Sequence, residues 1–201
     1  SGQHGLSQQC SDNLHQNGAN QAQQMVQHVF LPLSVFLAPH TVLQLAEDIK
    51  NGMGWEELTQ HRAPQLIANT YPFFTLDTLE YLKKGGRISA ATAFLGSAMA
   101  IKPVVAVSEG EIVMLGKARG SKNGNNFLMK EIEKADGIDF TRPFCLGYTG
   151  LSDEMLQKYI KDSEALWSEH TDQLPVCSLG ATIGTHVGPG AIAVAFFSPQ
   201  S

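Results

Sequence analysis

Apolar residues recur with helical spacing between residues 42 and 49. They follow the i, i+3, i+4, i+7 pattern of one helix face, which holds Val42, Leu45, Ala46 and Ile49. Asn51-Gly52 predicts the end of this helix, and a second helix of mixed amphipathicity is expected over 55–69. The run 25–37 mixes aliphatic and aromatic residues with a proline, which predicts a short buried strand and its connection.

Beyond residue 70, short apolar runs alternate with helical patterns. One helix is predicted to open at Asp77, with Glu80 three residues later in a capping-box arrangement, and to end at Gly85-Gly86. The predicted strands cover 71–76, both arms of a hairpin within 102–115, 142–150, 176–183 and 191–197, and further helices cover 89–100, 127–135 and 152–169. This order predicts an α/β or α+β sheet domain over 71–201.

The composition is that of a folded globular protein, with 201 residues of which 43% are hydrophobic and 16% charged. A net charge of -5 offers no basic field for a phosphate backbone, so we expect no nucleic-acid partner. Three scattered cysteines, Cys10, Cys145 and Cys177, favour reduced thiols and a cytoplasmic location. No apolar run approaches the roughly 20 residues of a membrane span.

The sequence motifs of several common catalytic and cofactor sites are missing from the chain. We find no HExxH, CxxC, Walker A, GxGxxG or GxSxG pattern. The sequence therefore predicts no metal site and no cofactor, and it provides no recognisable setting for a serine nucleophile.

The strongest candidate site is the segment GTHVGPG at 184–190, which precedes the last apolar run. Its glycines permit positive φ and can expose backbone N–H groups, so an anion-binding loop with donors from Thr185 and His186 is one interpretation. A tight turn between two strands, with His186 in a structural role, is the other. Three basic residues, Lys83, Lys84 and Arg87, flank Gly85-Gly86. They could bind an anion, or they could simply complement the C-terminus of the predicted helix.

Three stretches carry a family resemblance, in order and in register: FFTLDTLEYLKKGGRIS at 73–89, IKPVVAVSEGEIVMLGKARGSKNG at 101–124 and IGTHVGPGAIAVAFF at 183–197. Together they resemble the bacterial DegV family of fatty-acid-binding proteins. The resemblance implies a remnant of an N-terminal parallel α/β domain over 1–70, followed by a C-terminal α/β lipid-binding domain over 71–201. The family's leading strand motif has no counterpart here, so the chain is expected to lack the family's N-terminal segment.

The resemblance implies a binder and not an enzyme. Such a protein buries a long-chain fatty acid as its ligand and presents the carboxylate to the catalytic subunit of a fatty acid kinase, which forms the acyl phosphate. This places the chain in phospholipid metabolism, with no membrane span and at most transient contact with a membrane surface.

The family's carboxylate-binding positions map onto His186, Thr185 and Arg87, with Ser7 as the weakest match because its neighbours depart from the family's serine-rich loop. Apolar residues expected to line the acyl-chain pocket are Phe73, Phe94, Leu95, Met99, Ile101 and Phe196. Two alternatives stay open at this point. One is a small hydrolase or acyltransferase with His186 as general base, and the other is a shortened domain without a competent pocket.

Overall fold

The computed structural model describes residues 38–87, 101–108 and 111–199, and its centre is a mixed six-stranded sheet. The strands are β1 (Thr70–Thr75), β2 (Ile101–Ser108), β3 (Glu111–Arg119), β4 (Cys145–Tyr148), β5 (Val176–Ser178) and β6 (Ile192–Phe197). Their order across the sheet is β3-β2-β1-β6-β4-β5, and only β4 and β5 pair in parallel among these strands. The mixed α/β class predicted from the sequence is confirmed, whereas a domain boundary near residue 70 stays a prediction.

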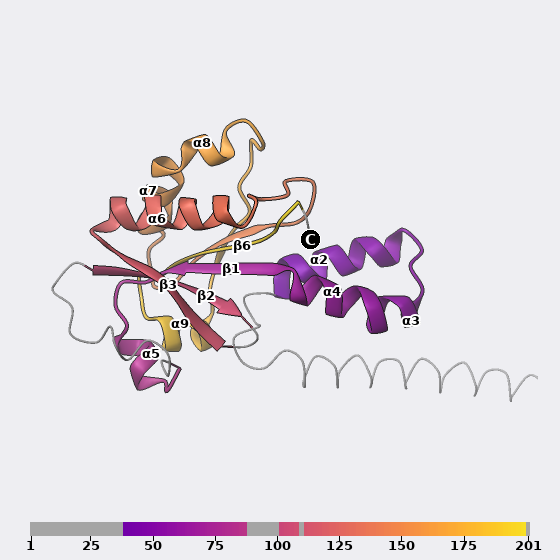
Figure 1. The fold of residues 1–201 in the computed structure, drawn as a ribbon, viewed down its shortest axis with the longest axis horizontal. Coiled ribbons are helices and arrows are strands. Elements are labelled where there is room, and N and C mark those ends of the chain that lie inside the picture. The colour runs from indigo at the N-terminus through magenta and orange to yellow at the C-terminus, as the bar shows by residue number, and fades with distance from the viewer. Residues whose placement is uncertain (1–37, 88–100, 109–110, 200–201) are drawn as a thin grey trace, which may run out of the picture.

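Helices flank the sheet on two faces and beyond one end (Figure 1). They are α2 (Ala38–Lys50), α3 (Trp55–Glu57), the π-helical turn η1 (Leu58–Arg62), α4 (Ala63–Ala68), α5 (Glu80–Lys84), α6 (Ser121–Lys134), α7 (Glu154–Asp162), α8 (Glu164–Trp167) and α9 (Ala181–Val187). α6, α7 and α8 lie over one face, α5 and α9 lie over the other, and α2 to α4 lie beyond the end of β1.

The two faces of the sheet bury different kinds of side chain. On β6, Ile192, Val194 and Phe196 point to the face under α6 and α7, while Ala193 and Ala195 belong to the cluster under α5 and α9. Successive strand residues point to opposite faces, so this alternation makes one face bulky and the other small along the same strand. We call these the α6–α7 face and the α5–α9 face.

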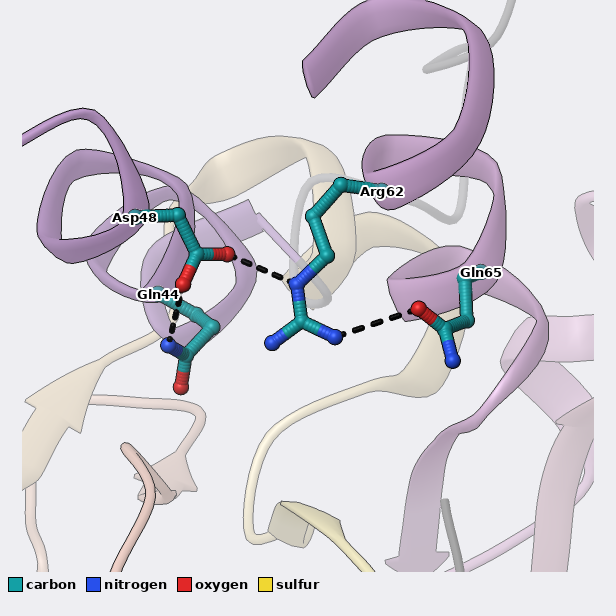
Figure 2. Close-up of polar contacts among 4 residues, drawn as sticks. All are labelled: Gln44, Asp48, Arg62 and Gln65. Carbon is teal, nitrogen blue, oxygen red and sulfur yellow. Dashed lines mark hydrogen bonds and ion pairs between the residues drawn. The ribbon is translucent and has the colours of Figure 1, made fainter. Parts of the chain in front are cut away.

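Helix α2 confirms the predicted helix but turns its apolar side outward. Val42 and Ile49 are 52% and 53% exposed, whereas His40 and Gln44 are buried. Polar contacts hold this orientation, as Figure 2 shows: the Asp48 carboxylate accepts a hydrogen bond from Gln44 and pairs with Arg62 Nε at 2.7 Å. Arg62 also donates to Gln65 at 3.1 Å, so a row of polar contacts from buried Asp48 to exposed Gln65 joins α2 to η1 and α4.

Two local predictions were wrong. The expected capping box does not form. Helix α5 begins at Glu80, whose backbone N–H donates to the Thr78 hydroxyl at 3.2 Å. Asp77 instead forms an ion pair with Lys102. The strand expected over 176–183 ends at Ser178, and a helix follows it.

The predicted hairpin is confirmed as β2 and β3, and the helix expected over 127–135 begins earlier, at Ser121. The strand expected over 25–37 and the helix over 89–100 lie outside the described residues.

Candidate functional site

His186 lies in the last turn of helix α9 and not in a turn between two strands, which corrects the sequence prediction. The helix forms because Ile183 and Val187 share a face that is buried in the cluster with Leu82. It stops at Gly188, whose φ of +80° only glycine adopts without strain. His186 is thereby fixed at the edge of the α5–α9 face.

A pair of glycine contacts locks α5 to α9. A Cβ on Gly85 would lie 2.5 Å from His186 Nδ1, and a Cβ on Gly188 would lie 2.3 Å from Cδ2 of Tyr81. Each helix therefore ends at a glycine, and an aromatic ring of the other helix packs against that glycine. Nδ1 of His186 is buried and has no hydrogen-bond partner among the described residues.

The segment after α9 is held by Thr149. The Thr149 hydroxyl donates to the Gly188 carbonyl at 2.5 Å and accepts from the Ala191 N–H at 2.9 Å. The N–H groups of Gly188 and Gly190 donate to the carbonyls of Gly184 and Thr149. Because these backbone N–H groups already donate within the protein, they do not provide the donors that one interpretation of the sequence offered for an anion, and the candidate anion contact in this segment is the His186 side chain.

Arg87 and Thr185 lie near His186 but are exposed. Arg87 donates through one guanidinium nitrogen to the Gly85 carbonyl at 2.8 Å, so it shares Gly85 as a neighbour with His186. The Thr185 hydroxyl donates to the Ala181 carbonyl at 2.7 Å, one helical turn back. It is thus engaged with the helix backbone and is not paired with His186 in the arrangement that a nucleophile and its base would need.

The predicted pocket residues that the structure describes do not lie beside His186. Phe73 and Phe196 pack edge to face at 5.5 Å within the α6–α7 face, on the side of the sheet opposite His186. Ile101 is the half-buried first residue of β2. Ser7, Phe94, Leu95 and Met99 lie outside the described residues.

The apolar residues that do share the face of His186 are others, and the sequence analysis did not single them out as pocket residues. Phe74, Leu76, Leu82, Ile183, Val187 and Ala193 belong to this cluster. A signal was available in β1: its neighbours Phe73 and Phe74 must point to opposite faces, so only one of them can lie on the side of His186.

Substitution of Gly85 by alanine tests the contact with His186 directly. The backbone of Gly85 is right-handed, at φ −78° and ψ −2°, so alanine brings overlap with the imidazole and no backbone strain. We expect the ring NMR signals of His186 to shift, with a stability loss of about 1–3 kcal/mol.

Gly86→Ala is the matched control, because Gly86 has a φ of +67° and nothing within 4 Å of its Cβ position. It should lose about 1–2 kcal/mol to strain and leave the His186 signals in place. Unchanged His186 signals in Gly85→Ala would contradict the described contact.

Within the described residues, no helix has the length and apolar character to cross a membrane. The same part of the chain holds no cluster of three or more histidine, cysteine, aspartate or glutamate residues able to bind a metal ion.

Comparison with known proteins gives a consistent result. The family model described as uncharacterised proteins of the DegV family matches residues 6–199. A DegV domain-containing protein of Clostridium perfringens is 32% identical over 157 residues, which is 76% of this chain and 53% of the relative. The chain spans about half the length of the curated relatives it matches.

Two solved structures share this fold. A DegV family protein from Thermus thermophilus, described by its fatty acid binding, superimposes with a TM-score of 0.65 at 28% identity, over 79% of this chain and 55% of that one. A stearic-acid-binding protein from Eubacterium ventriosum gives 0.64 at 26% identity, over 77% and 53%. With the family model matched along nearly the whole sequence, the chain belongs to the DegV family.

Proposed function

We propose that this protein binds a long-chain fatty acid, with the carboxylate at His186 and the acyl chain against the α5–α9 face. The observation that carries the proposal is the His186 ring, which Gly85 and α9 hold at the edge of an apolar cluster. The fatty acids bound by the solved relatives from Thermus thermophilus and Eubacterium ventriosum support the same ligand class.

The imidazole suits a carboxylate because one of its nitrogens is fixed and enclosed. Nδ1 is buried against Gly85, so the rotation of the ring is restricted and Nε2 is the nitrogen available to meet a ligand. A hydrogen bond to an ionised group is worth about 1.5–3 kcal/mol. The exposed cations Lys83, Lys84 and Arg87 lie within two residues of Gly85, which contacts His186, and they favour an anion in this region.

The acyl chain supplies most of the affinity in this proposal. Each buried methylene contributes about 0.8 kcal/mol, so a long chain contributes on the order of 10 kcal/mol before association costs. Alanines at 191, 193 and 195 carry little side-chain volume on the α5–α9 face, which suits the close approach of an extended hydrocarbon.

We further propose that the protein is a carrier and not an enzyme, and that it acts in the cytoplasm in phospholipid metabolism. It would hold the acyl chain and present the carboxylate to the catalytic subunit of a fatty acid kinase. The cations near His186 are the proposed contact for this partner. Their reversal, as Lys83→Glu with Lys84→Glu, should lower phosphorylation of bound lipid in a kinase-coupled assay by more than it lowers the amount of lipid bound, because most of the affinity comes from the acyl chain.

The test of binding is lipid extraction from the purified protein, followed by titration of fatty acid into the stripped protein. We expect a bound fatty acid, and we expect His186→Ala to weaken binding by roughly 10- to 100-fold. His61→Ala is the control, because His61 is an exposed histidine on η1 and should leave binding unchanged. Protein that carries no lipid and takes up none would refute the proposal.

A further inference from the structure

Two cysteines far apart in the sequence meet on neighbouring strands. Cys145 opens β4 and Cys177 lies in the middle of β5, and their Sγ atoms are 3.2 Å apart in a thiol–thiol hydrogen bond. In the parallel register Cys177 lies opposite Gly147, two residues beyond Cys145. The cysteines are therefore diagonal neighbours on one face of the sheet, and Cys177 packs against the α5–α9 cluster.

The two thiols differ in access and in acidity. Cys145 is buried and Cys177 is half-buried. The hydrogen bond from Cys145 stabilises the Cys177 thiolate and lowers the pKa of Cys177 to about 7, while the same bond and burial raise the pKa of Cys145. A thiolate with a pKa near neutrality is the attacking species in thiol–disulfide exchange, so Cys177 is the entry point.

We propose that Cys145 and Cys177 are a reversible redox pair that closes to a disulfide by exchange with a small-molecule disulfide. The inference rests on the placement of the two sulfurs and is independent of the proposed lipid ligand.

The reaction has two balanced steps. The Cys177 thiolate attacks one sulfur of the small disulfide, forms a mixed disulfide and releases one thiolate. Cys145 then loses its proton and attacks Sγ of Cys177, which forms the Cys145–Cys177 bond and expels the second thiolate. Each released thiolate takes up a proton, so two protein thiols are oxidised and one small disulfide is reduced to two thiols.

Closure needs a modest movement at the sheet edge. The sulfurs must approach from 3.2 Å to about 2.05 Å, and diagonal neighbours begin with their Cα atoms rather far apart for a disulfide. The strand that must move is β5, which has three residues and pairs on one side alone with β4 in the sheet. Because only Leu179 and Gly180 separate β5 from α9, the bond would restrain the segment that leads to His186.

The experiment uses the full chain with Cys10→Ser, which removes the third cysteine. We incubate it with oxidised glutathione, quench it with acid and measure intact mass and a non-reduced peptide map. We expect the loss of two hydrogen masses, no retained glutathione, one peptide that links residues 145 and 177, and full reversal by dithiothreitol.

The control variant is Cys10→Ser with Cys145→Ala, which cannot complete the second step. It should retain one glutathione on Cys177, more slowly because the hydrogen bond from Cys145 is lost, and this identifies the attacking thiol without requiring the disulfide. Retained glutathione in the two-cysteine protein, a disulfide between two copies of the chain, or two thiols that stay free would each overturn the proposal.

Discussion

Replacement of Gly188 by alanine should destabilise the protein by about 2–6 kcal/mol, one of the two largest effects we expect from a single change. Gly188 has a φ of +80° and a ψ of 173°, a backbone conformation that costs a non-glycine residue about 1–3 kcal/mol. The new Cβ would also lie 2.3 Å from Cδ2 of Tyr81, and overpacking of this kind adds roughly 1–3 kcal/mol. Urea unfolding monitored by circular dichroism measures the total loss in the free energy of unfolding.

The chain contains a matched control for the conformational part. Gly190 has a φ of +75°, but its Cβ position meets nothing nearer than Asp77 Cβ at 4.0 Å. Gly190→Ala should therefore show the strain alone, about 1–2 kcal/mol. A double-mutant cycle with Tyr81→Ala should remove the overlap and lower the cost of Gly188→Ala to that of the backbone strain alone. An equal cost of the two alanine variants in the wild-type background would contradict the described α5–α9 contact.

The second large effect is a loss of stability in acid through His40. This residue is fully buried, both ring nitrogens lack hydrogen-bond partners among the described residues, and its ring lies 4.9 Å from that of Phe197. Burial, with a further contribution from the positive charge of Arg142, lowers the pKa of His40 from 6.5 to about 4. The neutral form is the one that the fold accepts.

Acid destabilises the folded protein at His40 because the unfolded chain binds the proton more tightly than the folded chain does. The unfolded chain binds it with a pKa near 6.5 and the folded chain only near 4, so protonation favours unfolding as the pH falls through this window. The contribution of His40 is complete above pH 6.5, and about 3 kcal/mol is lost by pH 4.

Urea unfolding from pH 7 to pH 4 measures this loss, and His40→Leu should abolish it. His61→Ala, which changes an exposed histidine, should keep the wild-type pH dependence. Parallel curves for wild type and His40→Leu would assign the acid sensitivity to other groups.

The sequence predicts well those elements whose local pattern and final environment agree. The paired strands β2 and β3 carry valines before, and further apolar residues after, the Glu-Gly pair of the sequence, and their antiparallel register matches that pattern. The prediction was wrong at α9 because its sequence, ATIGTHV, contains β-branched residues that favour a strand. Burial of Ile183 and Val187 with Leu82 outweighs this propensity and stabilises the helix.

The candidate site was predictable in its polar part only. A glycine-rich motif drew attention to His186, but its enclosure depends on Gly85, about a hundred positions earlier in the chain. The pocket prediction separated hydrophobic from polar residues without assigning each strand residue to a face. For that reason it assigned Phe73 and Phe196 to the same site as His186, although they lie on the other side of the sheet.

The position of β6 has a consequence for how the chain is made. Residues 192–197 form the last strand along the described chain, yet they occupy the interior of the sheet, between β1 and β4. Until this segment has left the ribosome, no strand joins β1, β2 and β3 to β4 and β5 in the sheet, and β1 and β4 each keep an unpaired edge. The nascent chain therefore cannot complete this sheet until residues 192–197 have been made, and its unpaired strand edges are open to aggregation until then.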